Sequence, residues 1–155
     1  MHRGRYFEDF HVGDTVETAG ITVSESQMLD FAAMYDPQPF HVDSLAAMES
    51  PFGGIIASGF QTLSLTFRLV CDTGLLSGTG LGSGGGDTLR WHRPVFPGDT
   101  LRVSLEVIEV RPSKSKADCG NVRIKYTTIN QANETVMSVI FHHLIRRREP
   151  DTTMV

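Results

Sequence analysis

The apolar segment that begins at Gly59 and ends near Cys71 constrains the fold more than any other. If this segment is helical, its large hydrophobic side chains cover most of the helix circumference: Phe60, Leu63, Leu65, Phe67, Leu69 and Val70. A helix that is apolar nearly all round is expected to be buried. The chain has 155 residues, which suits one domain over residues 1–155. In a domain of this size, a curved sheet is the obvious structure to wrap such a helix.

The second half of the chain provides that sheet. Segments with alternating hydrophobic residues or strand-like composition lie at 88–94, 101–107, 122–126 and 136–145. A slip in the alternation at Ile108 predicts a β-bulge. Successive strands with short turns favour antiparallel pairing. The glycine-rich stretch from Gly78 to Gly86 is interpreted as a flexible loop. The predicted class is α+β, with an antiparallel sheet wrapped around one long central helix.

A first helix is predicted to begin near Glu25. Ser24 and Gln27 have the spacing of a capping box, in which the side chain of each residue bonds the backbone of the other. Pro37 disfavours helical geometry at Asp36, so the helix should end there. A second, short helix over 44–48 is expected after Asp43, which is a good N-cap residue.

Asp36 is the first candidate for chemistry. It continues the predicted buried stripe of Leu29, Ala32 and Ala33, so its carboxylate should be tilted toward the apolar interior. Burial disfavours the charged form, and so does the negative end of a helix dipole. Both effects are expected to raise the pKa of Asp36, which would suit a group that exchanges protons.

His41 follows five residues later and is the second candidate. Pro37 and Pro39 each fix a backbone angle, so the intervening loop should be stiff. Such a loop can hold a carboxylate and an imidazole at a set separation, with a water between them. Taken alone, an Asp at a helix end is usually a cap, and a loop His is usually structural. Their combination on one rigid turn is what favours a catalytic role.

Ser58 and Gly59 stand where the central helix should begin. Ser58 is a natural N-cap, and the amide of Gly59 should be among those with no partner inside the helix. Such amides, helped by the helix dipole, can stabilise a developing oxyanion. The alternative is an ordinary cap and turn with no chemical role.

Three segments together resemble a known family. They read YDPQPFHVD at 35–43, FGGIIASGF at 52–60 and WHRPVFPGDTL at 91–101. In this order they are similar to the MaoC-like dehydratases and the R-specific enoyl-CoA hydratases, which have the hot-dog fold. The resemblance extends from about Phe10 to Arg146.

The resemblance implies a role for each matching residue. Asp36 and His41 match the catalytic pair, and Gly59 matches the glycine whose amide faces the thioester oxygen. The sequence leaves open which member of the pair is the base and which is the acid.

The chain departs from the family pattern at three positions. Gln38 replaces the usual Asn, Phe40 replaces a smaller aliphatic residue, and Ser58 replaces the usual His. None of these changes removes the acid–base pair. Phe40 and Ser58 are expected to alter the shape of the acyl pocket.

The implied activity is that of a hydro-lyase, which adds water to or removes it from the 2,3 bond of an acyl thioester. The substrate would be an acyl-CoA or acyl-carrier thioester, with no cofactor and no metal, and the chain would form a homodimer. One alternative is a hot-dog thioesterase, which would release free thiol. Another is a non-catalytic acyl-CoA-binding module, which would bind thioesters tightly without turnover.

Composition argues against several other classes of function. A net charge of −4 gives no reason to expect binding to nucleic acid or to an anionic membrane. Cys71 and Cys119 lie far apart and form no metal or disulfide motif. The apolar segment 60–70 is too short to span a bilayer, and the charged first ten residues lack a signal-peptide core. A cytoplasmic location is expected.

The remaining charged and histidine residues carry weaker predictions. Structural roles are expected for His92, His142 and His143, the last of which lies on the apolar face of its strand. Residues that could meet the phosphates of coenzyme A, although solvated surface charge is the alternative for each, are Arg90, Arg93, Lys114 and Lys116.

Overall fold

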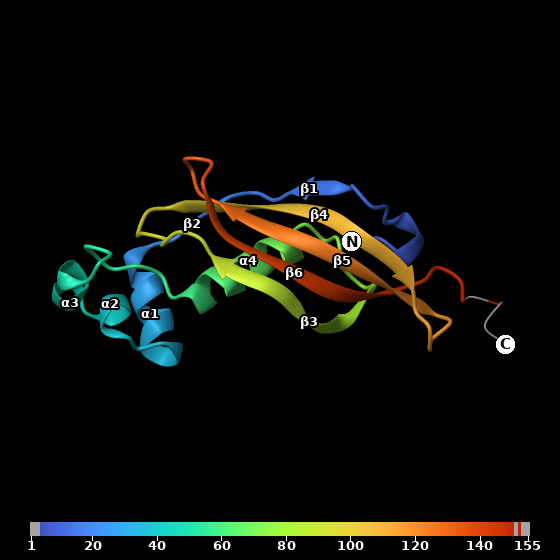
Figure 1. The fold of residues 1–155 in the computed structure, drawn as a ribbon, viewed down its shortest axis with the longest axis horizontal. Helices are drawn as coiled ribbons and strands as arrows, with labels where there is room; N and C mark the ends of the chain where they lie inside the picture. Colours follow the sequence, from blue (N-terminus) through green and yellow to red (C-terminus); the bar gives the residue numbers. More distant parts are fainter. Residues whose placement is uncertain (1–3, 151, 153–155) are drawn as a thin grey trace.

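The computed structural model describes residues 4–150 and 152, and it confirms the α+β class with an antiparallel sheet (Figure 1). The sheet has the strand order β1-β4-β5-β6-β3, and β2 pairs separately with β4. The strands are β1 (Thr15–Glu17), β2 (Ile21–Thr22), β3 (Gly80–Trp91), β4 (Thr100–Pro112), β5 (Cys119–Ile129) and β6 (Thr135–Arg146). The sheet therefore places β3 at one edge.

The helices form two groups (Figure 1). The long α4 (Gly59–Asp72) runs along the sheet, while three shorter helices gather beyond one end of it. These are α1 (Glu25–Tyr35), α2 (Pro39–Val42) and α3 (Ser44–Glu49), and a single 3-10 turn, η1 (Phe7–Asp9), lies near the N-terminus. Within the described residues, every helix falls short of the length and apolar character that a membrane crossing requires.

Local capping signals place the helix boundaries as predicted. Ser24 accepts a hydrogen bond from the Gln27 amide at 3.3 Å, and the Gln27 side chain accepts one from the Ser24 amide at 3.0 Å. The Asp43 carboxylate accepts from the first amides of α3, and Ser58 caps α4. Each cap satisfies donors that the helix itself leaves free.

The prediction that α4 is buried on all sides is wrong for the single chain. Phe60 and Phe67 remain 57% and 41% exposed. The buried face instead mixes polar and apolar side chains: Gln61, Thr62, Thr66, Leu69 and Val70. The reason is geometric, because a sheet packed against a helix covers one side of it and leaves the other side outside.

The predicted loop at 78–86 is also wrong over most of its length. Gly80 begins β3, which pairs with β6 along an irregular register. Gly82 and Gly85 have positive φ angles of 115° and 142°, which glycine adopts without strain. The register shifts in this stretch. Glycines thus let the edge strand follow β6 with local bulges. The predicted bulge near Ile108 is confirmed as a register shift between Val107 and Glu109 of β4.

One buried hydroxyl pair joins α4 to the sheet. Thr66 Oγ1 donates to the Thr62 carbonyl at 2.8 Å, and it lies 2.6 Å from Thr128 Oγ1 on β5. Because the Thr66 proton is used within the helix, Thr128 is the donor in the second contact. Both threonines are fully buried.

Because Thr128 donates and Thr66 accepts, two similar substitutions should have unequal effects on stability. Thr66→Val leaves the Thr128 hydroxyl without an acceptor and should cost about 1–3 kcal/mol of unfolding free energy. Thr128→Val leaves Thr66 bonded to Thr62 and should cost less. The double variant should be more stable than Thr66→Val alone, because it also removes the buried Thr128 hydroxyl that has lost its acceptor. Urea unfolding of the three variants measures this order, and a double variant that is the least stable would contradict it.

His143 on β6 makes a second buried polar contact, with Tyr126 on the neighbouring strand β5. Its Nε2 lies 2.6 Å from the Tyr126 hydroxyl, and both residues are buried. Burial, together with the neighbouring His142, lowers the pKa of His143 to about 4. A histidine in an unfolded chain titrates near ~6.5.

A pH dependence of stability follows. Between the two pKa values the unfolded chain binds a proton that the folded chain does not, so stability should fall as the pH drops from about 6.5 toward about 4. The loss is on the order of 3 kcal/mol at most, at ~1.4 kcal/mol per pKa unit. Urea unfolding at several pH values should show a weaker dependence in Tyr126→Phe/His143→Leu than in the wild type. Equal dependence in the two proteins would rule out this role of His143.

Candidate active site

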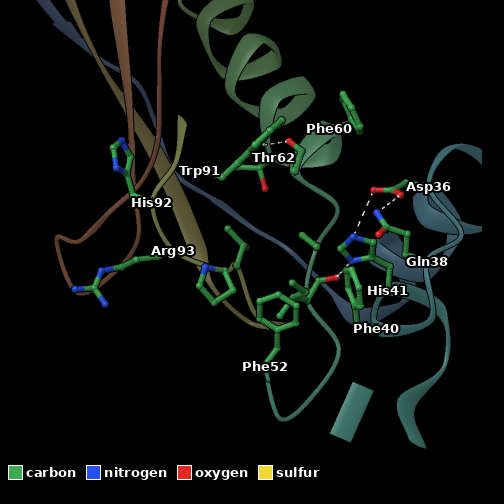
Figure 2. A pocket seen from close by; sticks show the side chains of 15 residues that line it. Asp36, Gln38, Phe40, His41, Phe52, Phe60, Thr62, Trp91, His92 and Arg93 are labelled. Carbon is green, nitrogen blue, oxygen red and sulfur yellow. Dashed lines mark hydrogen bonds and ion pairs between the residues drawn. The ribbon is translucent and has the colours of Figure 1, made fainter. Parts of the chain in front are cut away.

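A cavity of about 480 Å³ lies where the end of α1, the start of α4 and the end of β3 meet (Figure 2). Its walls come from three parts of the chain, at 36–41, 52–62 and 91–95. These coincide with the three segments that carry the family resemblance. Segments far apart in the sequence thus converge on one space.

Asp36 follows the last turn of α1, where its backbone amide still bonds the Ala32 carbonyl. Met28 and Ala32 are buried at the preceding helical positions, so Asp36 continues that row. The predicted stripe was partly wrong, because Leu29 is half-buried and Ala33 is exposed. The Asp36 side chain is nevertheless largely enclosed, with 13% of it exposed.

Three neighbours surround the Asp36 carboxylate. The Ser58 hydroxyl donates to Oδ2 at 2.7 Å, and the Gln38 amide donates to Oδ1 at 2.8 Å. His41 Nε2 lies 3.4 Å from Oδ2. Burial alone raises the pKa of Asp36, but the bonds from Ser58 and Gln38 and the proximity of His41 outweigh it, so the pKa is lowered. The prediction of a raised pKa was wrong, because it omitted these donors.

His41 lies on α2, a single helical turn that Pro39 begins, where a loop was predicted. The ring is buried, and its Nδ1 lies 2.8 Å from the Ile56 carbonyl. A carbonyl oxygen can only accept, so Nδ1 carries the proton of the neutral ring. The Nε2 lone pair is then directed toward Asp36. The edge of Phe40 packs against the ring, with centroids 4.5 Å apart.

When the His41 ring is neutral, the carboxylate and the imidazole present two acceptors to each other. Neither can donate to the other in this state, although 3.4 Å separates Asp36 Oδ2 from His41 Nε2. A water molecule has two protons and can donate to both atoms at once. The pair is arranged to hold a water, and either member can take its proton.

The first turn of α4 forms another part of the wall. Gly59 lines the cavity, and its amide belongs to the helix N-terminus, where amides lack an intrahelical partner. A Cβ on Gly59 would lie 2.5 Å from the indole of Trp91. The indole also donates to the Gly59 carbonyl at 2.9 Å. Glycine is required here because the ring occupies the space of a side chain.

The structure brings four of the five predicted site residues to the cavity wall. These are Asp36, Phe40, His41 and Gly59. Ser58 is fully buried behind the wall, where its hydroxyl donates to the Asp36 carboxylate.

Sequence reasoning did not single out two other wall residues, Thr62 and Trp91. Trp91 opens the third family-like segment, which was the available signal. His92 and Arg93 line the rim, where His92 bonds Ser138 at 2.8 Å and Arg93 pairs with Glu134 at 3.3 Å. In residues 4–150 and 152 no group of three or more His, Cys, Asp or Glu side chains could hold a metal ion.

Two curated proteins are similar to this chain in sequence. A protein of Bacillus subtilis named as uncharacterised is 31% identical over 145 residues, covering 90% of this chain and 98% of its own length. The mesaconyl-CoA hydratase of Cereibacter sphaeroides is 32% identical over 152 residues, covering 94% of this chain, and the match spans only 42% of that enzyme.

A solved structure agrees with these relatives. The MaoC-like dehydratase from Rhodospirillum rubrum has a TM-score of 0.88 at 38% identity, covering 94% of this chain and 99% of that one. The predicted hot-dog fold is thereby confirmed. The MaoC like domain family matches residues 9–130, and the chain belongs to this family.

Proposed function

We propose that this chain is an acyl-thioester hydro-lyase, which adds water to a 2-enoyl thioester or removes it from the 3-hydroxyacyl form. The observation that carries the proposal is the pair of acceptors, Asp36 Oδ2 and His41 Nε2, which face each other across 3.4 Å on the wall of a cavity. The names of the mesaconyl-CoA hydratase and the Rhodospirillum dehydratase support the same reaction class.

In the hydration direction, a water held by both side chains attacks the β-carbon. One of its protons passes to Asp36 or His41 and is then delivered to the α-carbon, so the pair ends unchanged. The Gly59 amide faces the thioester oxygen and stabilises it as it gains negative charge. Addition of water involves no net oxidation or reduction, so the reaction needs no redox cofactor.

The two members of the pair have different resting states in this scheme. The lowered pKa of Asp36 keeps it a carboxylate at neutral pH. The Ile56 carbonyl holds the proton of neutral His41 on Nδ1 and leaves Nε2 free to accept.

The proposed active protein is a homodimer of one MaoC-like domain per chain. Strand β3 pairs with β6 on one side and forms an edge on the other. Large apolar side chains that remain exposed on β3 and α4 are Leu81, Leu89, Trp91, Phe60 and Phe67. A second copy that covers this edge would bury them.

Removal of either member of the pair should abolish most of the activity. Asp36→Asn and His41→Ala are each expected to lower kcat for crotonyl-CoA hydration by at least about 100-fold, because each removes a proton acceptor. The loss of enoyl absorbance measures the rate. Asp43→Asn is the matched control. Position 43 lies outside the cavity lining, and Asn caps a helix as well as Asp does. Unchanged turnover in either site variant would contradict the assignment, and release of free thiol would favour the thioesterase.

Loss of a donor to Asp36 should move the acidic limb of the pH profile. The Ser58 and Gln38 bonds stabilise the carboxylate. Ser58→Ala or Gln38→Leu should therefore raise the pKa of Asp36. Activity that needs the carboxylate is lost as pH falls through this pKa, so the limb should move to higher pH in both variants. The pH dependence of kcat/KM measures it, and a limb that stays in place or moves to lower pH would refute this role of the donors.

A further inference from the structure

A path of hydrogen bonds joins Trp91 at the end of β3 to the carboxylate of Asp36. The indole Nε1 donates to the Gly59 carbonyl at 2.9 Å. The amide on the other side of that same peptide group, Phe60 N–H, donates to Ser58 Oγ at 3.2 Å. The Ser58 hydroxyl then donates to Asp36 Oδ2 at 2.7 Å. One peptide group and one hydroxyl thus separate the indole from the carboxylate.

The chemistry of its ends fixes the direction of this path. An indole N–H can only donate, and an ionised carboxylate can only accept. Every intermediate group therefore accepts on the Trp91 side and donates on the Asp36 side. Hydrogen bonds aligned in this way polarise one another, so that each strengthens the next. Donation into the Gly59 carbonyl makes the Phe60 amide and then the Ser58 hydroxyl better donors.

The packing around Gly59 keeps the indole in place. A Cβ at position 59 would lie 2.5 Å from the ring of Trp91. The ring of Phe60 meets the indole edge-on, with centroids 5.9 Å apart. In Figure 2 the Trp91 side chain lies against the first turn of α4, on the side of the cavity away from Asp36. The absence of a side chain at Gly59 thus lets β3 support the start of α4.

We propose that Trp91 is a positioning residue, which acts on Asp36 through the Gly59–Phe60 peptide and the Ser58 hydroxyl. It holds this peptide in the orientation in which the Phe60 amide bonds Ser58 Oγ. The inference rests on the proposed hydration only for its catalytic meaning. The effect on the carboxylate itself does not depend on which reaction the protein performs.

The charged and titratable groups near Asp36 would not explain a change in its pKa when Trp91 is replaced. His41 on α2 is the titratable group that lies against the carboxylate, and its nearest approach is 3.4 Å. His92 and Arg93 lie on the wall of the same cavity. Trp91 carries no charge, so its replacement leaves these charges unchanged. A change in the titration of Asp36 would then be carried by the hydrogen bonds.

The test follows the Asp36 carboxyl directly, by its carbon-13 chemical shift as a function of pH. The signal is assigned with Asp36→Asn. Trp91→Phe keeps an aromatic ring beside Gly59 and removes the N–H. It should raise the pKa of Asp36, by less than Ser58→Ala does. In a Ser58→Ala background, Trp91→Phe should cause no further change, because the path is already broken.

A matched control removes a neighbouring donor that is off the path. The Ser64 hydroxyl donates to the Phe60 carbonyl at 2.8 Å, one peptide group further along α4. Ser64→Ala should leave the titration of Asp36 unchanged. If Trp91→Phe does not fold, a tryptophan analogue with sulfur in place of the indole N–H gives the same test with the ring shape kept.

Two results would overturn the proposal. One is an Asp36 titration in Trp91→Phe equal to that of the wild type. The other is an equal shift with and without the Ser58 hydroxyl, which would mean that Trp91 acts by packing alone. The measurement needs no turnover. A wild-type protein without hydratase activity but with the expected titrations would refute the proposed function and leave the path intact.

Discussion

The hydroxyl of Ser58 is the contact on which the arrangement of the site depends. As the cap of α4 it accepts a hydrogen bond from the Phe60 amide, and it donates one to the carboxylate of Asp36 at the end of α1. One side chain thereby ties together two helices that start and stop on local signals of their own. The same bond offsets the cost of burying a carboxylate, which would otherwise favour the neutral acid.

The second constraint is the Ile56 carbonyl, which accepts from His41 Nδ1. This bond keeps a proton on Nδ1 and orients the ring so that Nε2 faces Asp36. When the ring is neutral, two acceptor atoms, Asp36 Oδ2 and His41 Nε2, therefore face each other. In that state the lone pairs of both side chains are available to a water.

Much of the fold could be predicted from local sequence. Ser24, Asp43 and Ser58 begin helices where their side chains can cap them, and alternation defines the long strands. The glycine-rich part of β3 could not be predicted, because its strand structure comes from pairing with β6, whose residues lie far along the chain. The exposed rings of Phe60 and Phe67 show a similar limit, since apolar pattern alone does not tell which face a sheet will cover.

The site was predicted better in its members than in its electrostatics. Asp36, His41 and Gly59 meet on one cavity, as the three motif segments implied. The direction of the Asp36 pKa shift was missed because it depends on Ser58, 22 residues away in the sequence. Trp91 was missed for the same reason, because its contact with Gly59 exists only once β3 and α4 are packed.

A crystal structure of Asp36→Asn with bound crotonyl-CoA is the decisive measurement for the proposed site. The thioester oxygen should lie within hydrogen-bond distance of the Gly59 amide, and the β-carbon should lie opposite the gap between residue 36 and His41 Nε2. A thioester bound with its reactive carbons outside that gap, or with its oxygen directed away from the start of α4, would contradict the proposed site.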